Sequence, residues 1–228
     1  MQMLKIKSAM PSSPYAPQWD IPIGVSQWQD HKKIDIIKSF LLSKEQELLT
    51  KFKILDDART GLSENDVTTR YGRYNLFDFA DECPEINDLL NFLRDSWLSF
   101  IQQDVTEPYP LQILCWYNII RKGQDIDVHR HAAGTSAYLS GNMHLDDYDT
   151  KTVYEYMEMP LTIPNIKGGL TIFPSYVEHG VAEYEGDKPR VSLAFDLYIY
   201  SPPWNLGCSN EVEHRPFMTE DMIKTING

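Results

Sequence analysis

From residue 108 to residue 200 the chain is a succession of short β-rich runs with no helical pattern between them. The runs are YPLQILCWYNII, TSAYLSGNMHL, TVYEYMEMPLTI, GGLTIFP, HGVAEYE and RVSLAFDLYIY, and Gly, Pro and Asp residues separate them. Several short strands in such an order predict an antiparallel sandwich or barrel. We therefore expect a jelly-roll-like β core over residues 108–202.

Helical patterns are confined to the first half of the chain. PEINDLLNFLRDSWLSFIQQ, which starts at Pro84, carries a continuous apolar stripe at helical spacing. SKEQELLTKFKIL begins with Ser43 and has Gln46 three residues later, a capping-box pattern that predicts a helix start at Ser43. Residues 57–80 are expected to form a loop over the body.

The ends of the chain complete the predicted organisation. The stretch through Asp20 is rich in Pro and Ser and is predicted to be an irregular arm, followed by a short strand in IPIGVSQW. The predicted fold class is α+β. Residues 1–107 supply the arm and supporting helices of the same domain, residues 108–202 the β core, and residues 203–228 a C-terminal tail.

Charge and composition narrow the range of functions. The net charge of −12 argues against a general nucleic-acid or anionic-membrane binder, which would need a basic face. No apolar run approaches the roughly 20 residues that cross a bilayer, and the N-terminus lacks the apolar core of a signal peptide. Cys83, Cys115 and Cys208 form no C-x-x-C pair, so we expect reduced thiols and a cytoplasmic protein.

Two of the six histidines stand at alternate positions of one predicted strand, in the segment DVHRH. Residues i and i+2 of a strand point to the same face, so His129 and His131 project together. A third candidate, His179, opens another predicted strand. Three protein ligands with open positions are typical of a catalytic metal centre. Taken alone, an H-x-H pair is also typical of solvated edge residues.

The run RVSLAFDLYIY alternates cleanly, with Arg190 and Ser192 on its polar face. If His179 lines a cavity, the next antiparallel strand would bring both residues into that cavity. An Arg fork beside a hydroxyl group is suited to holding a carboxylate; the alternative is an exposed charge at a strand start. Asn118 shares a strand face with Trp116, and we expect either a ligand contact or a satisfied core amide.

These motifs, in this order, resemble the Fe(II)- and 2-oxoglutarate-dependent oxygenases. The segments WYN, VHRH, LSG, GGLTIFPSYVEHGV and RVSLAFDLY follow one another as W-x-N, H-x-H, S-G, F-P-S…H and R-(I/V)-S do in a bacterial and phage branch of that family. KGQDIDVHRH is also similar to the lead-in of its prolyl-hydroxylase-like members. The resemblance covers roughly residues 108–200.

The resemblance implies a double-stranded β-helix, Fe(II) as the metal, and 2-oxoglutarate and O2 as cosubstrates. The implied reaction is hydroxylation of a peptidyl or small-molecule substrate, in the host cytoplasm if the chain is phage-encoded. No catalytic acid or base is required, because the metal breaks the bonds. The implied roles are iron binding by His129, His131 and His179, and cosubstrate binding by Arg190, Ser192 and Asn118.

One position departs from the family pattern, which has a carboxylate where this chain has His131. Asp125 and Asp127 share its strand face and are alternative ligands, but the order of an Asp127-x-His129 motif would be inverted. We therefore expect a three-histidine centre, a ligand set that also suits zinc, nickel or copper.

Two other functions remain open at this stage. A cupin-type three-histidine dioxygenase or isomerase without 2-oxoglutarate predicts no role for Arg190. A non-catalytic jelly-roll binding module predicts no stoichiometric metal.

Overall fold

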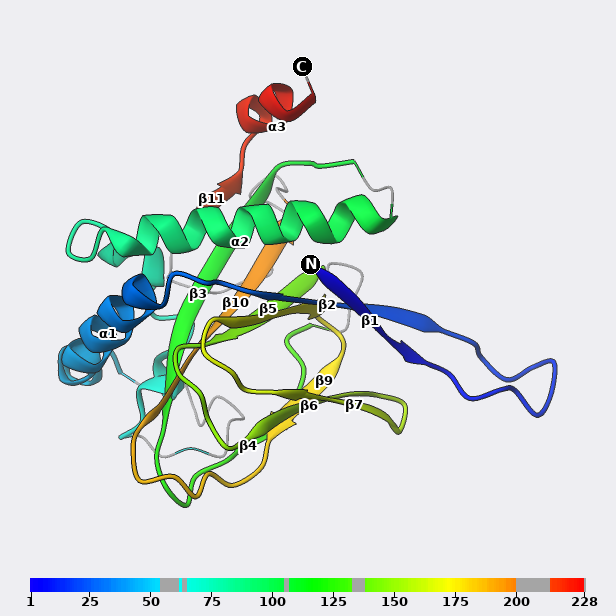
Figure 1. Cartoon of the computed structure of the whole chain (residues 1–228), viewed down its shortest axis with the longest axis horizontal. Helices are drawn as coiled ribbons and strands as arrows, with labels where there is room; N and C mark the ends of the chain where they lie inside the picture. Colours follow the sequence, from blue (N-terminus) through cyan, green and yellow to red (C-terminus); the bar gives the residue numbers. More distant parts are fainter. Residues whose placement is uncertain (54–61, 63–64, 105–106, 133–137, 200–213, 228) are drawn as a thin grey trace.

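The computed structural model describes residues 1–53, 62, 65–104, 107–132, 138–199 and 214–227. Over these residues the β structure divides into two antiparallel sheets (Figure 1). The larger sheet contains, in spatial order, β1 (Gln2–Lys7), β2 (Asp20–Gln27), β8 (Gly169–Pro174), β5 (Leu139–His144), β10 (Arg190–Ile199), β3 (Leu111–Ile120) and β11 (Arg215–Met218). The smaller contains β4 (Ile126–His129), β9 (Glu178–Val181), β6 (Lys151–Tyr156) and β7 (Met159–Pro164).

The predicted antiparallel β core is confirmed, and each of the six β-rich runs contains at least one strand. The run TVYEYMEMPLTI contains two, because Met157 and Glu158 adopt positive φ and turn β6 back into β7. The predicted α+β fold class is therefore confirmed, and the described residues form two long helices in the first half of the chain and a short one near the C-terminus.

Strand β10 lies at the centre of the larger sheet, between β3 and β5. One of its faces packs in the main hydrophobic core, together with the alternate residues of β3 and the apolar stripes of the helices; it is formed by Val191, Leu193, Phe195 and Leu197. The other face is turned toward the smaller sheet. Figure 1 shows α2 (Glu85–Ile101) crossing the outer side of the larger sheet, with α1 (His31–Lys51) beside it.

Helix α1 begins twelve residues before the predicted start, so the capping box at Ser43 is wrong. The cap is Asp30, whose side chain accepts a hydrogen bond from the Lys33 backbone N–H at 3.2 Å. The Ser43 hydroxyl instead donates to the Phe40 carbonyl in mid-helix. Helix α2 agrees with the sequence prediction, except that Pro84 is its N-cap and not its first residue.

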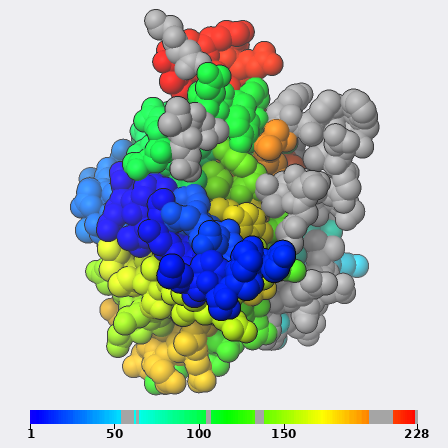
Figure 2. Space-filling model, turned by 90° about the vertical axis from the view of Figure 1, so that its right-hand side faces the viewer, coloured from blue at the N-terminus to red at the C-terminus, as the bar shows by residue number. Residues whose placement is uncertain are grey.

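The expected irregular arm is wrong at Gln2–Lys7, which form β1 and pair along their full length with β2. Ile6, Ile21 and Ile23 of this hairpin are buried against the smaller sheet. Figure 2 shows the hairpin, in blue, lying over the yellow-green strands. The arm thereby joins the two sheets along one side.

Among the described residues, three short 3-10 turns connect the helices to the larger sheet. The 3-10 turns Val67–Arg70 and Leu76–Phe79 lie within the predicted 57–80 loop, and between them Asn75 bonds the backbone of β3 at Ile113 and Cys115. A third 3-10 turn, Gln102–Asp104, follows α2.

At the C-terminus, β11 extends the sheet beyond β3, and α3 (Glu220–Asn227) follows it. The domain boundary predicted at residue 203 lies outside the described residues. Of the three cysteines, Cys83 and Cys115 are buried free thiols, and Cys208 lies outside the described residues. In the described part of the chain, no helix has the length and apolar character that a bilayer crossing requires.

The start of α1 can be tested by a pair of substitutions. Asp30→Ala should lower the free energy of unfolding by about 1 kcal/mol, because it removes the side-chain acceptor of the helix N-terminus. Ser43→Ala should change it by a few tenths of a kcal/mol at most, since Ser43 is exposed in mid-helix. Urea denaturation of both variants measures the difference. A larger loss for Ser43→Ala would return the cap to the position predicted from the sequence.

Candidate metal centre

Three imidazoles converge where β4 pairs with β9. His129 and His179 are Cα partners across this pair, and His131 follows two residues after His129. The ring centroids of His129 and His179 lie 4.4 Å apart, and that of His131 lies 5.4 Å and 5.0 Å from them. One ligand nitrogen from each ring falls within 4.8 Å of the others, a spacing that suits a single metal ion.

The Nδ1 atoms of all three rings are hydrogen-bonded away from the cluster. His129 Nδ1 lies 2.7 Å from the Asp127 carbonyl, and His179 Nδ1 lies 3.3 Å from the Val177 carbonyl. His131 Nδ1 lies 2.5 Å from Asp196 Oδ1. Because carbonyl oxygens only accept, Nδ1 donates in His129 and His179, and Nε2 keeps its lone pair. This tautomer presents Nε2 to a metal.

Burial favours the neutral, metal-binding form of two of the rings. Desolvation lowers the pKa of His129, and the neighbouring His131 lowers it further. Desolvation also holds the pKa of His179 well below its usual range, with contributions from His131 and His129. Neutral imidazole is the species that binds a metal, so these two rings need lose no proton at neutral pH.

Asp196 is the contact that the sequence analysis missed. It lies on the polar face of β10, and its Oδ1 accepts hydrogen bonds from His131 and, at 2.5 Å, from the Ser140 hydroxyl. Burial would raise the pKa of this carboxyl, but His131 and the hydrogen bonds from His131, Ser140 and Tyr198 outweigh burial and lower it. The group is therefore a buried carboxylate. The signal available in the sequence was its place in the alternation of RVSLAFDLYIY.

A cavity of about 290 Å³ connects the histidines to the inner face of the larger sheet. The residues that the alternation of RVSLAFDLYIY placed on one face all line it, namely Arg190, Ser192, Ala194 and Asp196. Trp116 and Asn118 of β3, which share a strand face, also line it. At its outer end lie Tyr71 and Arg130, which are the exposed members of the lining.

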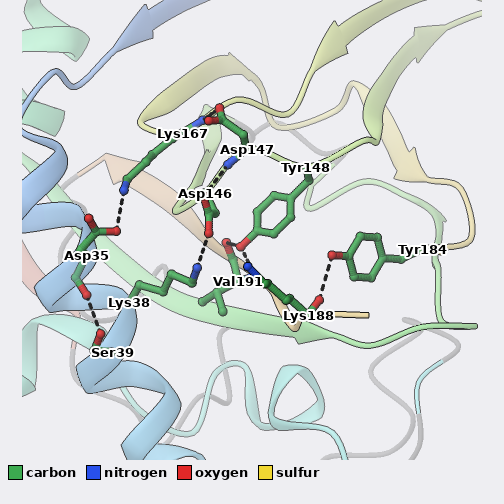
Figure 3. Close-up of polar contacts among 10 residues, drawn as sticks. All are labelled: Asp35, Lys38, Ser39, Asp146, Asp147, Tyr148, Lys167, Tyr184, Lys188 and Val191. Carbon is green, nitrogen blue, oxygen red and sulfur yellow. Dashed lines mark hydrogen bonds and ion pairs between the residues drawn. The ribbon is translucent and has the colours of Figure 1, made fainter. Parts of the chain in front are cut away.

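Arg190 is 1% exposed, and its Nε and Nη1 atoms have no hydrogen-bond partner among the described residues. Burial lowers its pKa to about 10, so the guanidinium remains charged at neutral pH. The Tyr148 ring lies 5.9 Å away. Figure 3 shows how the start of β10 is held: the Tyr148 hydroxyl accepts from the Val191 N–H, and the Tyr184 hydroxyl donates to the Lys188 carbonyl, each at 2.8 Å. A fixed, buried cation that forms no ion pair with the described residues is suited to an anionic ligand.

The next row of the sheet adds polar groups beside Arg190. Ser192 is the Cα partner of Asn118 on β3 and of His144 on β5, so the three residues form a row across the cavity wall. Asn118 Oδ1 and His144 Nδ1 have no partner within the described part of the chain. Burial, and then the charge of Arg190, hold the pKa of His144 well below its usual range. His144 was not among the residues that the sequence motifs singled out, yet it lines the cavity.

The structure brings the six candidate residues together by a different route from the one expected. His179 and Arg190 do not lie on neighbouring strands: β9 belongs to the smaller sheet and β10 to the larger one. The two sheets face each other across the cavity, so the expectation of adjacent strands was wrong although both residues line it. Neither Asp125 nor Asp127 joins the three-histidine group, and Asp127 contributes its backbone carbonyl instead.

The chain resembles known proteins in one segment of sequence and in fold. Residues 144–196 match the family described as "Putative 2OG-Fe(II) oxygenase". This segment runs from His144 through His179 to Asp196 and includes Arg190 and Ser192. The resemblance drawn from the sequence motifs is thereby confirmed. No curated protein matches the chain.

Solved structures confirm the double-stranded β-helix fold. A non-heme monooxygenase, ThoJ, in complex with nickel is 12% identical, with 87% of this chain and 82% of that chain covered and a TM-score of 0.51. A prolyl hydroxylase from Trichoplax adhaerens, in complex with a hypoxia inducible factor peptide fragment, is also 12% identical, with 77% and 83% covered and a TM-score of 0.50. At this identity the likeness concerns the fold.

Proposed function

We propose that this chain, which matches the 2OG-Fe(II) oxygenase family over residues 144–196, is an Fe(II)- and 2-oxoglutarate-dependent oxygenase that hydroxylates a peptidyl or small-molecule substrate. The observation that carries the proposal is the buried guanidinium of Arg190, whose Nε and Nη1 have no partner among the described residues, in the same cavity as three convergent imidazoles. A metal at one end and a cation at the other match a ligand that chelates with one end and carries a carboxylate at the other.

The three histidines fit an iron site. Their Nδ1 atoms are engaged elsewhere, so their three Nε2 atoms would hold the ion beside the cavity. When bound, Fe(II) supplies the oxidising chemistry, in which O2 and 2-oxoglutarate give succinate, CO2 and an oxidised substrate.

Arg190 fits the far carboxylate of 2-oxoglutarate. Nε and Nη1 of Arg190 have no partner among the described residues, so the guanidinium has donors to offer the carboxylate, and the Ser192 hydroxyl adds another. Asn118 is the Cα partner of Ser192 on β3 and lines the same cavity. These residues orient the cosubstrate, and the burial of the site keeps water from competing for Arg190.

The primary substrate would approach at the outer end of the cavity. Trp116 shields one side of the metal centre, with its ring centroid 5.4 Å from that of His131. The exposed Tyr71 packs against Trp116, with the ring centroids 5.7 Å apart and the planes tilted by 49°. The more exposed lining, including Arg130, thus remains for the primary substrate while the deepest part holds the cosubstrate.

Metal binding provides the first test. His179→Ala should weaken Ni(II) binding to the metal-free protein by more than about 100-fold, because losing a ligand costs more than losing an outer-shell partner. His31→Ala, at the exposed start of α1, should retain the parent affinity. Titration against a chromophoric chelator measures both. Parent-like binding by His179→Ala would remove this centre from the proposal.

The position of His131 provides the second test. His131→Asp recreates the carboxylate of the resembling family and should keep Fe(II) bound, with an altered spectrum and turnover. His131→Ala should retain the metal less well than His131→Asp, because it offers no ligand atom. Metal content after gel filtration distinguishes them. Loss of the metal in Asp127→Asn, with none in His131→Ala, would reassign the ligand to Asp127.

Cosubstrate binding provides the third test. Arg190→Ala should weaken 2-oxoglutarate binding about 30- to 1000-fold, which corresponds to the roughly 2–4 kcal/mol of a charge-assisted bidentate contact. Arg190→Lys should bind 2-oxoglutarate with an affinity between those of the parent and Arg190→Ala, because an ammonium keeps the charge but lacks the forked guanidinium donors. Calorimetric titration of the Ni(II)-loaded proteins measures these affinities.

The matched control is Arg130→Ala, because Arg130 also lines the cavity but is exposed and faces Glu178 at 3.7 Å. It should change 2-oxoglutarate affinity only a few-fold. Equal affinities for Arg190→Ala and the parent would eliminate the cosubstrate site and favour a cupin-type three-histidine enzyme.

A further inference from the structure

The resembling family has a carboxylate among its metal ligands. In this chain a carboxylate, that of Asp196, instead forms a hydrogen bond with His131 of the three-histidine group. Asp196 Oδ1 contacts His131 Nδ1 at 2.5 Å, and the two residues are 65 positions apart in the sequence. Both side chains are largely buried, at 15% and 9% exposed. A charge-assisted hydrogen bond in such surroundings is shorter and stronger than a neutral one in water.

The Asp196 carboxylate is held in place from both sides. Its backbone pairs with Leu114 of β3 and Ser140 of β5 in the middle of the larger sheet. The Ser140 hydroxyl donates to the same Oδ1 at 2.5 Å, and the Tyr198 hydroxyl donates to Oδ2 at 3.4 Å. Asp196 is therefore a fixed acceptor toward which the His131 ring turns.

The other two histidines have weaker outer partners. His129 and His179 donate Nδ1–H to backbone carbonyls on their own strand or the preceding turn, which are neutral acceptors. His131 alone among the three has a carboxylate partner. Such a partner raises the basicity of the ligand nitrogen on the opposite side of the ring.

We propose that Asp196 is a positioning residue for the metal centre, which orients His131 with Nε2 toward the ion and supplies negative charge through the imidazole. This inference rests on the proposed function. The His131–Asp196 pair would then bring to the centre the charge that a directly coordinating carboxylate brings elsewhere in the family. A chain with H-x-H in place of a carboxylate ligand would thereby keep a similar total charge around the ion.

The test measures Ni(II) affinity of the metal-free full chain by competition with a chromophoric chelator. Asp196→Asn keeps the shape of the side chain but removes its charge, and should weaken binding about 10- to 100-fold, as the loss of outer-shell partners does. Asp125→Asn removes the same charge from an exposed position near the centre, and should stay within about twofold of the parent. Thermal unfolding of each metal-free protein checks that the fold is retained.

A second background separates positioning from general electrostatics. In His131→Asp the ligand becomes a carboxylate, so Ni(II) binding stays measurable but the imidazole through which Asp196 acts is gone. Adding Asp196→Asn to this background should leave the affinity unchanged or raise it, because it relieves repulsion between neighbouring carboxylates. The effect of the same substitution thus disappears or reverses between the two backgrounds.

The outcomes are distinct. A 10- to 100-fold loss that vanishes in the His131→Asp background supports the inference. An equal loss in both backgrounds, or no loss in the parent, overturns it while the metal centre stands. A parent that binds no Ni(II) overturns the metal centre and this inference together. If Asp196→Asn unfolds, Ser140→Ala replaces it, with an expected loss of about two- to tenfold in the parent and none in His131→Asp.

Discussion

The alternation of side chains along β10 is the constraint on which the rest of the site depends. The strand lies between β3 and β5, so its residues at odd positions must fill the core beneath the helices. The even-numbered residues from Arg190 to Asp196 consequently face the cavity. Arg190 and Asp196 lie roughly 20 Å apart along this face of the strand. A shift of one residue in register would bury both charges in the hydrophobic core. The fold and the site are thus specified by the same pairing.

This arrangement explains how the larger sheet tolerates a buried cation. A guanidinium without a counter-ion is costly to bury, and in the described part of the chain Nε and Nη1 of Arg190 have no hydrogen-bond partner while the Tyr148 ring lies 5.9 Å from the guanidinium. The cost is acceptable where the backbone around it is held firmly, as Tyr148 holds Val191 at the start of β10. An incoming carboxylate would then gain a preformed site and would need no reorganisation of the sheet.

Local periodicity was sufficient to predict the strands and to bring together most of the residues that line the cavity, because a two-residue repeat is visible within a single run. It placed Arg190 and Ser192 on one face and paired His129 with His131. It could not predict which sheet each strand would join, since that depends on pairings between distant segments; hence the wrong expectation that β9 and β10 are neighbours. The prediction of where α1 starts was wrong for a different reason. Asp30 and Ser43 are both favourable N-cap residues, and only the packing of the first three turns of the helix distinguishes them.

The contact between His131 and Asp196 belongs to the class that no local pattern reveals, because it crosses from one sheet to the other. It nevertheless bears on the most unusual feature of the sequence, the histidine in place of a carboxylate. Three neutral ligands alone would leave the full charge of a divalent ion in a buried site. Asp196 lies close enough to offset one unit of it through His131, while Arg190 at the opposite end adds a positive charge that a dicarboxylate cosubstrate would neutralise. In this view the two ends of β10 balance the charges that metal and cosubstrate bring into one cavity.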